Sequence, residues 1–76
     1  MVYPLCQLKA GETACITWIL CGEAMEKQLN ALGFSFGCPV TCILRSGGGR
    51  LCAYKIGGRV IGLRAAVTRE ILVRRP

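Results

Sequence analysis

Hydrophobic residues change their spacing several times along the chain, and each change predicts a new element. Residues 14–20 (ACITWIL) are β-branched or aromatic and follow the turn-like sequence KAGET, so they predict a strand. From Gly22 the apolar residues Met25, Leu29 and Leu32 instead fall three or four positions apart, which is the spacing of one helical face. We therefore expect a strand followed by a short helix.

Two glycines, Gly33 and Gly37, are predicted to end this helix and turn the chain back. A residue without Cβ readily adopts the left-handed conformation that ends many helices, and an apolar residue such as Phe34 commonly follows it and packs on the last turn. Gly37 then precedes residues 39–45 (PVTCILR), which are typical of a strand. The glycines should thus reverse the chain from the helix into this strand.

The strand predicted at residues 39–45 alternates between two faces. Val40, Cys42 and Leu44 are expected together on one face. The residues expected on the opposite face are Thr41, Ile43 and Arg45.

The following residues, 50–64 (RLCAYKIGGRVIGLR), are two β-rich runs separated by Gly57 and Gly58, which is the composition of a two-residue hairpin turn. Closing the hairpin at these glycines fixes which residues face the core. They are Cys52 and Tyr54 on the first run, opposite Leu63 and Ile61 on the second. Lys55 and Arg64 are expected on the other face.

Residues 65–70 predict a single helical turn, and residues 71–73 a last short strand. About five strands with one short helix inserted after the first predict a mainly β fold, a small and strongly bent barrel. We expect one domain, residues 1–76, with a thin core, because so short a chain buries only about 60% of its unfolded surface. Apolar runs fall short of the ~20 residues of a membrane helix, and no secretory signal is recognisable, so a cytoplasmic protein is expected.

The residues that could carry chemistry do not form a catalytic or metal-binding pattern. Without a secretory signal the six cysteines are expected to be reduced thiols. Cys38 and Cys42 are four apart, but no C-x-x-C pair and no histidine accompanies them, so we predict no metal site and no cofactor. Glu23 and Glu26 are expected to be solvated, and SGGGR (46–50) lacks the Lys-Ser/Thr of a phosphate loop. No catalytic residue is predicted, and an enzyme is not expected.

Charge divides the chain unevenly. Residues 1–44 hold two cations and three carboxylates, whereas residues 45–76 hold eight cations and one carboxylate. The cationic half, residues 45–76, is expected to attract an acidic protein, an anionic membrane face or nucleic acid. The alternative is that its arginines are simply solvated on outward strand positions. Trp18 is either an ordinary barrel residue or an outward anchor for a partner. The cationic candidates for binding are Arg45, Arg50, Arg59 and Arg64.

Several segments together resemble the FeoA proteins of bacterial ferrous iron transport. The opening of that family is similar to residues 4–12 (PLCQLKAGE), its Leu-x-x-Leu-Gly-aliphatic-x-x-Gly motif to residues 29–37 (LNALGFSFG), and its final hairpin and strand to residues 56–64 and 71–73. The chain differs from the family in its shortened SGGGR loop and in its apolar residues after Arg64. The resemblance implies an SH3-like barrel.

The same resemblance implies a small accessory protein that binds and modulates FeoB, a membrane permease with a cytosolic GTP-binding domain. The chain would then reach the membrane only through this partner, and an arginine could be donated to the GTPase. The residues expected to bind the partner are Phe36, Arg45, Arg59 and Arg64. The alternative is an SH3-like regulatory or nucleic-acid-associated module, related to the C-terminal domain of iron-dependent repressors. A small-molecule substrate is not expected, and weak self-association is left open.

Overall fold

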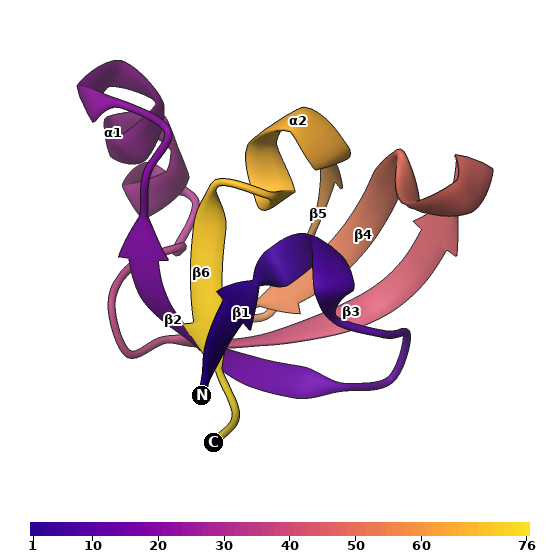
Figure 1. Cartoon of the computed structure of the whole chain (residues 1–76). Helices are drawn as coiled ribbons and strands as arrows, with labels where there is room; N and C mark the ends of the chain where they lie inside the picture. The colour runs from indigo at the N-terminus through magenta and orange to yellow at the C-terminus, as the bar shows by residue number, and fades with distance from the viewer.

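Six antiparallel strands form one sheet in the order β1-β6-β2-β3-β4-β5 in the computed structural model, which describes residues 1–76 (Figure 1). The strands are β1 (Val2–Pro4), β2 (Thr13–Ile19), β3 (Pro39–Ser46), β4 (Leu51–Ile56), β5 (Arg59–Arg64) and β6 (Ile71–Arg74). The helices are α1 (Glu23–Ala31) and α2 (Ala65–Thr68), with 3-10 turns η1 (Leu5–Gln7) and η2 (Gly47–Gly49). The mainly β fold predicted from the sequence is confirmed.

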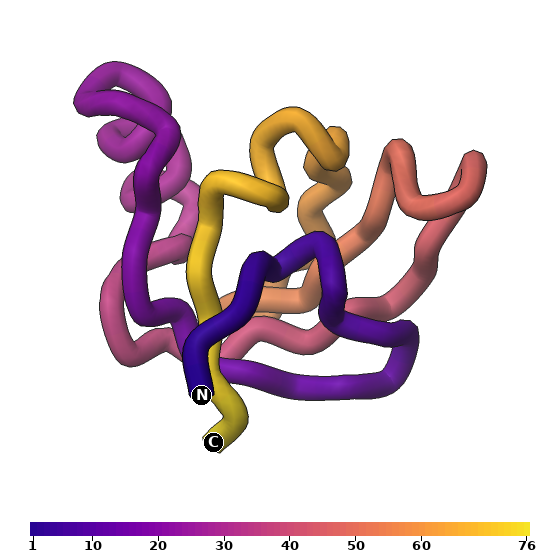
Figure 2. The backbone as a smooth tube through the Cα atoms, viewed as in Figure 1, coloured from indigo at the N-terminus to yellow at the C-terminus, as the bar shows by residue number.

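Both ends of the chain lie together, because the first strand pairs with the last (Figure 2). Val2 is opposite Arg74 and Pro4 is opposite Leu72. The prediction of five strands missed β1, so the helix α1 follows the second strand rather than the first. A three-residue strand that ends in proline has little local pattern, and it gains its hydrogen bonds only from β6, about 70 residues away in the chain.

Gly33 ends α1 in the predicted left-handed conformation, with φ 102°. The Gly33 amide donates to the Asn30 carbonyl at 3.0 Å, and the Phe34 amide donates to the Leu29 carbonyl at 2.9 Å. These two bonds satisfy carbonyls that the end of a helix would otherwise leave unpaired. Phe34 and Leu29 are both fully buried, so the cap also fastens α1 to the core.

Gly37 forms the second turn and ties it to β2. Its φ is 84°, and its amide donates to the Ile16 carbonyl at 2.8 Å. In return the Ile16 amide donates to the Cys38 carbonyl at 2.9 Å. The chain therefore leaves α1, bonds to the middle of β2 at Ile16 and enters β3, in the reversal that the two glycines predicted.

A β-bulge in β3 overturns part of the predicted alternation. Val40 and Cys42 are buried, but the pairing with β4 shifts between Cys42 and Leu44, so that Leu44 is opposite Ala53 and Arg45 is opposite Cys52. One extra residue exchanges the two faces beyond the bulge. Leu44, predicted on the same face as Val40 and Cys42, is 59% exposed, and Arg45 instead shares a face with the buried Cys52 while remaining exposed itself.

The β4–β5 hairpin turns at Gly57 and Gly58, in the predicted register. Cys52, Tyr54 and Ile56 enter the buried core, whereas Ile61 and Leu63 are half-buried and pack against it. The predicted turn at residues 65–70 is α2, and Lys55 and Arg64 are exposed on the opposite face as expected.

Replacing Gly33 by alanine should destabilise the fold by about 1–2 kcal/mol, because an L-residue is strained at positive φ. A Cβ there would lie 3.9 Å from the Ile56 side chain, an ordinary contact, so the cost isolates the backbone conformation. The measurement is the free energy of unfolding in urea. Gly62→Ala is the matched control, since Gly62 lacks a positive φ and its Cβ would meet nothing closer than 4.0 Å. Equal effects at the two positions would contradict the explanation.

Candidate functional site

A cleft of about 390 Å³ lies between β2, α1 and the turn that follows α1. β2 contributes residues 16–19, α1 contributes Glu26 and Asn30, and the turn contributes Phe36. Trp18 and Phe36 are 63% and 78% exposed, which is unusual for aromatic side chains in so small a protein. Two large apolar groups thus border one hollow without being covered by the chain.

A second β-bulge turns Trp18 outward. In β2 the pairing with β6 shifts between Ile16 and Trp18, so Ile16 is opposite Val73 in the core while Trp18 is opposite Leu72 on the outer face. Uninterrupted alternation from Ile16 would have placed the indole in the core. Trp18 therefore faces outward, and its role as an anchor for a partner stays a prediction.

Phe36 is exposed because of the turn between Gly33 and Gly37. Phe34 points into the core and anchors the turn, and Phe36, two residues later, is held at the surface next to β2. Phe36 was singled out from the sequence as a binding residue, and the structure places it in the cleft with Trp18.

The polar side chains of the cleft are the Glu26 carboxylate, the Asn30 amide and the Thr17 hydroxyl. Glu26 and Asn30 lie one helical turn apart on α1, and no cation lines the hollow. Aromatic faces together with a carboxylate suit an apolar side chain that is flanked by a cationic or hydrogen-bonding group. The arrangement can bind a protein segment, and it contains no pair of groups that could act as acid and base.

The four arginines predicted or considered as binding residues do not form one surface. Arg59 is opposite Ile56, whose side chain lies against Gly33, so it belongs to the end of the barrel where α1 terminates. Arg64 is at the other end of β5, about 16 Å away at ~3.3 Å per residue. There Arg64 and Arg50 line a separate hollow of about 400 Å³.

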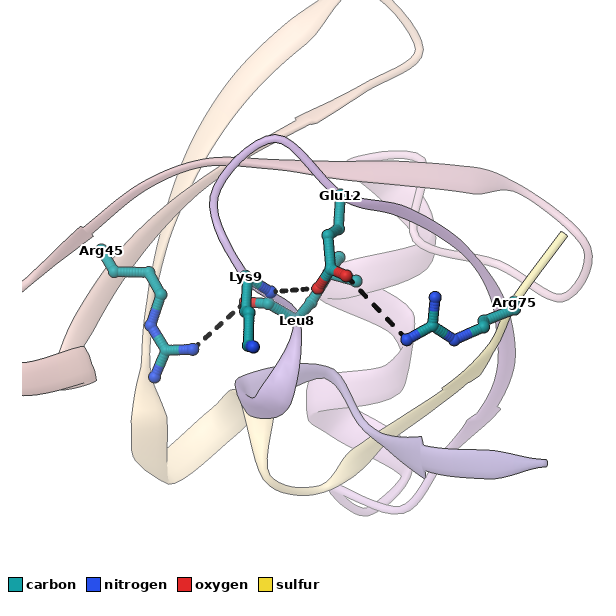
Figure 3. Close-up of polar contacts among 5 residues, drawn as sticks. All are labelled: Leu8, Lys9, Glu12, Arg45 and Arg75. Carbon is teal, nitrogen blue, oxygen red and sulfur yellow. Dashed lines mark hydrogen bonds and ion pairs between the residues drawn. The ribbon is translucent and has the colours of Figure 1, made fainter.

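Arg45 has a structural contact within the barrel. Beyond the β3 bulge its Nη1 donates to the Leu8 carbonyl at 3.3 Å (Figure 3). Its guanidinium also lies against Gly49, where a Cβ would come within 2.7 Å of Nη2. The guanidinium thus connects β3 to the chain segment before β2, which the sequence did not indicate.

Glu12 closes the turn before β2 rather than contributing to a reactive site. Its Oε1 accepts a hydrogen bond from the Lys9 amide at 2.8 Å, and its Oε2 lies 3.9 Å from Nη2 of Arg75 (Figure 3). The carboxylate therefore joins the start of the barrel to the end of the chain.

All six cysteines are free thiols, of which Cys42 and Cys52 are buried. Burial raises the pKa of Cys42 and of Cys21 above the ordinary thiol value. Nowhere do three or more potential metal-ligating side chains gather. The absence of a metal site stays a prediction from the sequence.

Two buried side-chain hydroxyl groups lack a hydrogen-bond partner. The Tyr54 hydroxyl and the Thr68 hydroxyl are buried and have no hydrogen-bond partner in the protein. Burial likewise raises the pKa of Tyr54. These groups are buried between β4 and α2, away from the Trp18–Phe36 cleft, and so form part of the core rather than of the candidate site.

The fold is that of a small SH3-like domain, and it carries an exposed aromatic cleft between β2, α1 and the turn after α1. Among protein families, the FeoA domain matches residues 3–75. The chain therefore belongs to the FeoA family, which is associated with ferrous iron transport. No curated protein matches it in sequence. None of its helices is both long enough and apolar enough to cross a membrane.

Solved structures of FeoA proteins share this fold. The FeoA protein of Chlorobium tepidum has a TM-score of 0.88 at 24% identity, over 95% of this chain and 69% of its own. The FeoA of Stenotrophomonas maltophilia complexed with zinc is described as a prokaryotic SH3 domain protein. Its TM-score is 0.80 at 22% identity, and the match covers 92% of this chain and 87% of its own.

A manganese-dependent transcriptional repressor contains the same fold within a longer chain. Its TM-score is 0.87 at 16% identity, and the match covers 99% of this chain but 42% of the repressor. At this identity the likeness concerns the fold alone.

The free energy of unfolding should fall as the pH rises above about 9, because Cys42 keeps its proton in the folded protein to a higher pH than in the unfolded chain. In this pH range the unfolded state binds fewer protons than the folded state. The free energy of unfolding therefore falls by up to about 1.4 kcal/mol for each pH unit and each buried thiol. Tyr54 adds a loss of the same sign at higher pH. Urea unfolding with a reductant, from pH 7 to 11, measures the slope.

Cys42→Ala should flatten that slope around pH 9 to 10, and Tyr54→Phe should flatten it at higher pH. Val40→Ala, which shortens a buried side chain that does not ionise, is the matched control and should lower the stability without changing the slope. A slope unaffected by Cys42→Ala would show that other groups cause the alkaline loss.

Proposed function

We propose that this chain is an accessory protein of bacterial ferrous iron uptake that binds and modulates a FeoB-type GTPase permease by protein–protein contact. Membership of the FeoA family supports the assignment to ferrous iron transport. The observation that carries the mode of action is the Trp18–Phe36 cleft, in which two exposed aromatic groups border one hollow. Such aromatic groups commonly supply much of the binding energy of an interface.

The chemistry of the cleft favours a particular partner segment. Trp18 and Phe36 would hold an apolar side chain, and the Glu26 carboxylate beside them would attract a lysine or arginine of the same segment. Arg59, at the same end of the barrel, would face an acidic group at the edge of the contact. Arg64 and Arg45 lie elsewhere, and a role for them in the same contact requires a partner that reaches along β5 or across η2.

Modulation rather than catalysis is the expected role, since the cleft has no acid–base pair and no nucleophile. An effect on the permease would come from binding one nucleotide state of its GTP-binding domain better than another. Donation of an arginine to the GTPase would instead raise the rate of GTP hydrolysis itself.

Phe36→Asp should weaken binding to the soluble GTP-binding domain of a FeoB-type permease by about 30-fold or more, because it removes a central aromatic contact and places a charge in the cleft. Trp18→Ala should have a similar effect, and Arg59→Glu should weaken binding about fivefold, as expected for a charge at the edge. Isothermal titration calorimetry with GDP and with a GTP analogue measures these changes and the nucleotide dependence.

The matched control is Val2→Asp, which places the same charge on an exposed apolar position of β1 outside the cleft. It should bind as the parent protein does. Equal losses for Val2→Asp and Phe36→Asp would contradict the assignment of the cleft. GTP turnover measured in the same samples tests arginine donation, and an unchanged rate in a saturated complex would exclude it.

The second candidate is a regulatory or nucleic-acid-associated module, favoured by the fold shared with the repressor and by the cationic second half of the chain. Binding through phosphates must weaken steeply with salt, with a logarithmic slope of about −0.9 for each phosphate contacted. Titration of a DNA duplex between 50 and 200 mM salt tests this candidate. If no binding occurs even at low salt, it is excluded.

A further inference from the structure

The outer surface of the β3–β5 sheet exposes an apolar area that the Trp18–Phe36 cleft does not include. Its large side chains are Ile43, Leu44, Leu51 and Val60, with exposed fractions between 46% and 65%. We call this area the β3–β5 outer face. It contains four of the nine large hydrophobic residues that the protein leaves exposed.

Strand register brings these side chains together. Leu44 is opposite Ala53, which is opposite Gly62, and Leu51 and Val60 are in the adjacent rows on either side. The β3 bulge adds Ile43 to the exposed set. Because Ala53 and Gly62 are small, the surface between the larger residues is low, and the side chains of Leu44 and Val60 project from it.

Cations surround this face, and no carboxylate neutralises them. Lys55 is opposite Val60, Arg64 is opposite Leu51, and Arg50 immediately precedes Leu51. The sequence has no acidic residue from Lys27 to Arg69, which includes the whole of β3, β4, β5 and α2. The two ion pairs in the protein, Lys27–Glu23 and Arg75–Glu12, involve none of these cations.

The shape of the face suits a broad surface better than a peptide. The hollow of about 400 Å³ lined by Arg50, Leu51 and Arg64 touches only one edge of this face. None of the four hollows includes Ile43, Leu44 or Val60, so the centre of the face has no groove to receive a partner's side chain. Projecting apolar residues with lysine and arginine beside them are the features that place peripheral proteins at an anionic lipid interface.

We propose that the β3–β5 outer face binds the surface of an anionic lipid bilayer, with Leu44, Leu51 and Val60 entering the interfacial region. The ring of cations, Arg50, Lys55 and Arg64, lies against lipid phosphates. This inference goes beyond the proposed function, since it requires no permease, and it adds a direct membrane contact to the indirect one expected from the sequence. It would leave the Trp18–Phe36 cleft, which shares no residue with this face, free for a protein.

The test is co-sedimentation of the full chain with vesicles of phosphatidylglycerol and phosphatidylcholine (3:7), compared with vesicles of phosphatidylcholine alone. We expect binding to the anionic vesicles that weakens with salt, and little binding to the neutral ones. Arg64→Gln and Lys55→Gln should each lower the partition coefficient about fivefold. Leu44→Ser combined with Val60→Ser should lower it about tenfold.

Matched controls change the same chemistry elsewhere. Lys27→Gln removes a cation from α1, and Leu20→Ser removes an exposed apolar side chain after β2. Both should bind vesicles as the parent protein does. All of the altered residues are exposed, and circular dichroism confirms that each variant is folded.

Insertion itself is measured with a tryptophan probe. The only native tryptophan is Trp18, so Val60→Trp in a Trp18→Phe background reports from the face alone. Its emission should shift to the blue on anionic vesicles and be quenched by brominated lipid, whereas native Trp18 should respond to neither.

Two results would overturn the proposal. The first is the absence of vesicle binding at low salt. If the protein then binds a DNA duplex, the cations are assigned to nucleic acid. Unchanged vesicle binding by the Leu44→Ser and Val60→Ser variant would show a purely cationic contact. Since no permease is present, none of these results bears on the Trp18–Phe36 cleft.

Discussion

The left-handed backbone at Gly33, closed by the Phe34 amide on the Leu29 carbonyl, is the constraint on which the rest of the structure depends. It ends α1 and places Phe34 in the core in a single turn. Gly37 then bonds to Ile16, so the turn is fixed to β2 rather than projecting as a free loop. The position of Phe36, and with it the aromatic cleft, follows from these few backbone bonds.

Two β-bulges determine which of the large apolar side chains on β2 and β3 face outward. In β2 one extra residue before Trp18 turns the indole outward. In β3 one extra residue before Leu44 turns that leucine outward and moves Arg45 to the face of Cys52. Each bulge also bends its strand, as a small barrel requires. The same irregularities that curve the sheet therefore bring Trp18 into one of its exposed apolar areas and Ile43 and Leu44 into the other.

Those two areas differ in chemistry, and the difference follows from where the charges lie. The cleft beside α1 includes Glu26, because the acidic residues of the chain are confined to its first part and to Glu70. The β3–β5 outer face has cations only. The domain thus presents two surfaces of opposite electrostatic character, one hollow and one with projecting side chains. That arrangement is consistent with the accessory role proposed above.

Local pattern alone determined the helix and its glycine cap, the β4–β5 hairpin with its register, the short turn of α2 and the last strand. Each of these depends on residues close in sequence, where the absence of a Cβ or a period of two or 3.6 acts directly. Phe36 could be selected from the sequence for the same reason, as an apolar residue inside a short turn.

Only the tertiary structure decided the pairing of β1 with β6, the outward direction of Trp18 and Leu44, and the separation of Arg45, Arg59 and Arg64. Strand pairing between the two ends of a chain leaves almost no local trace. A bulge depends on how two distant strands must bend to share one core, and a shift of one residue exchanges the two faces of a strand. The residues were visible in the sequence, but which side of the sheet they occupy was settled by the closure of the barrel.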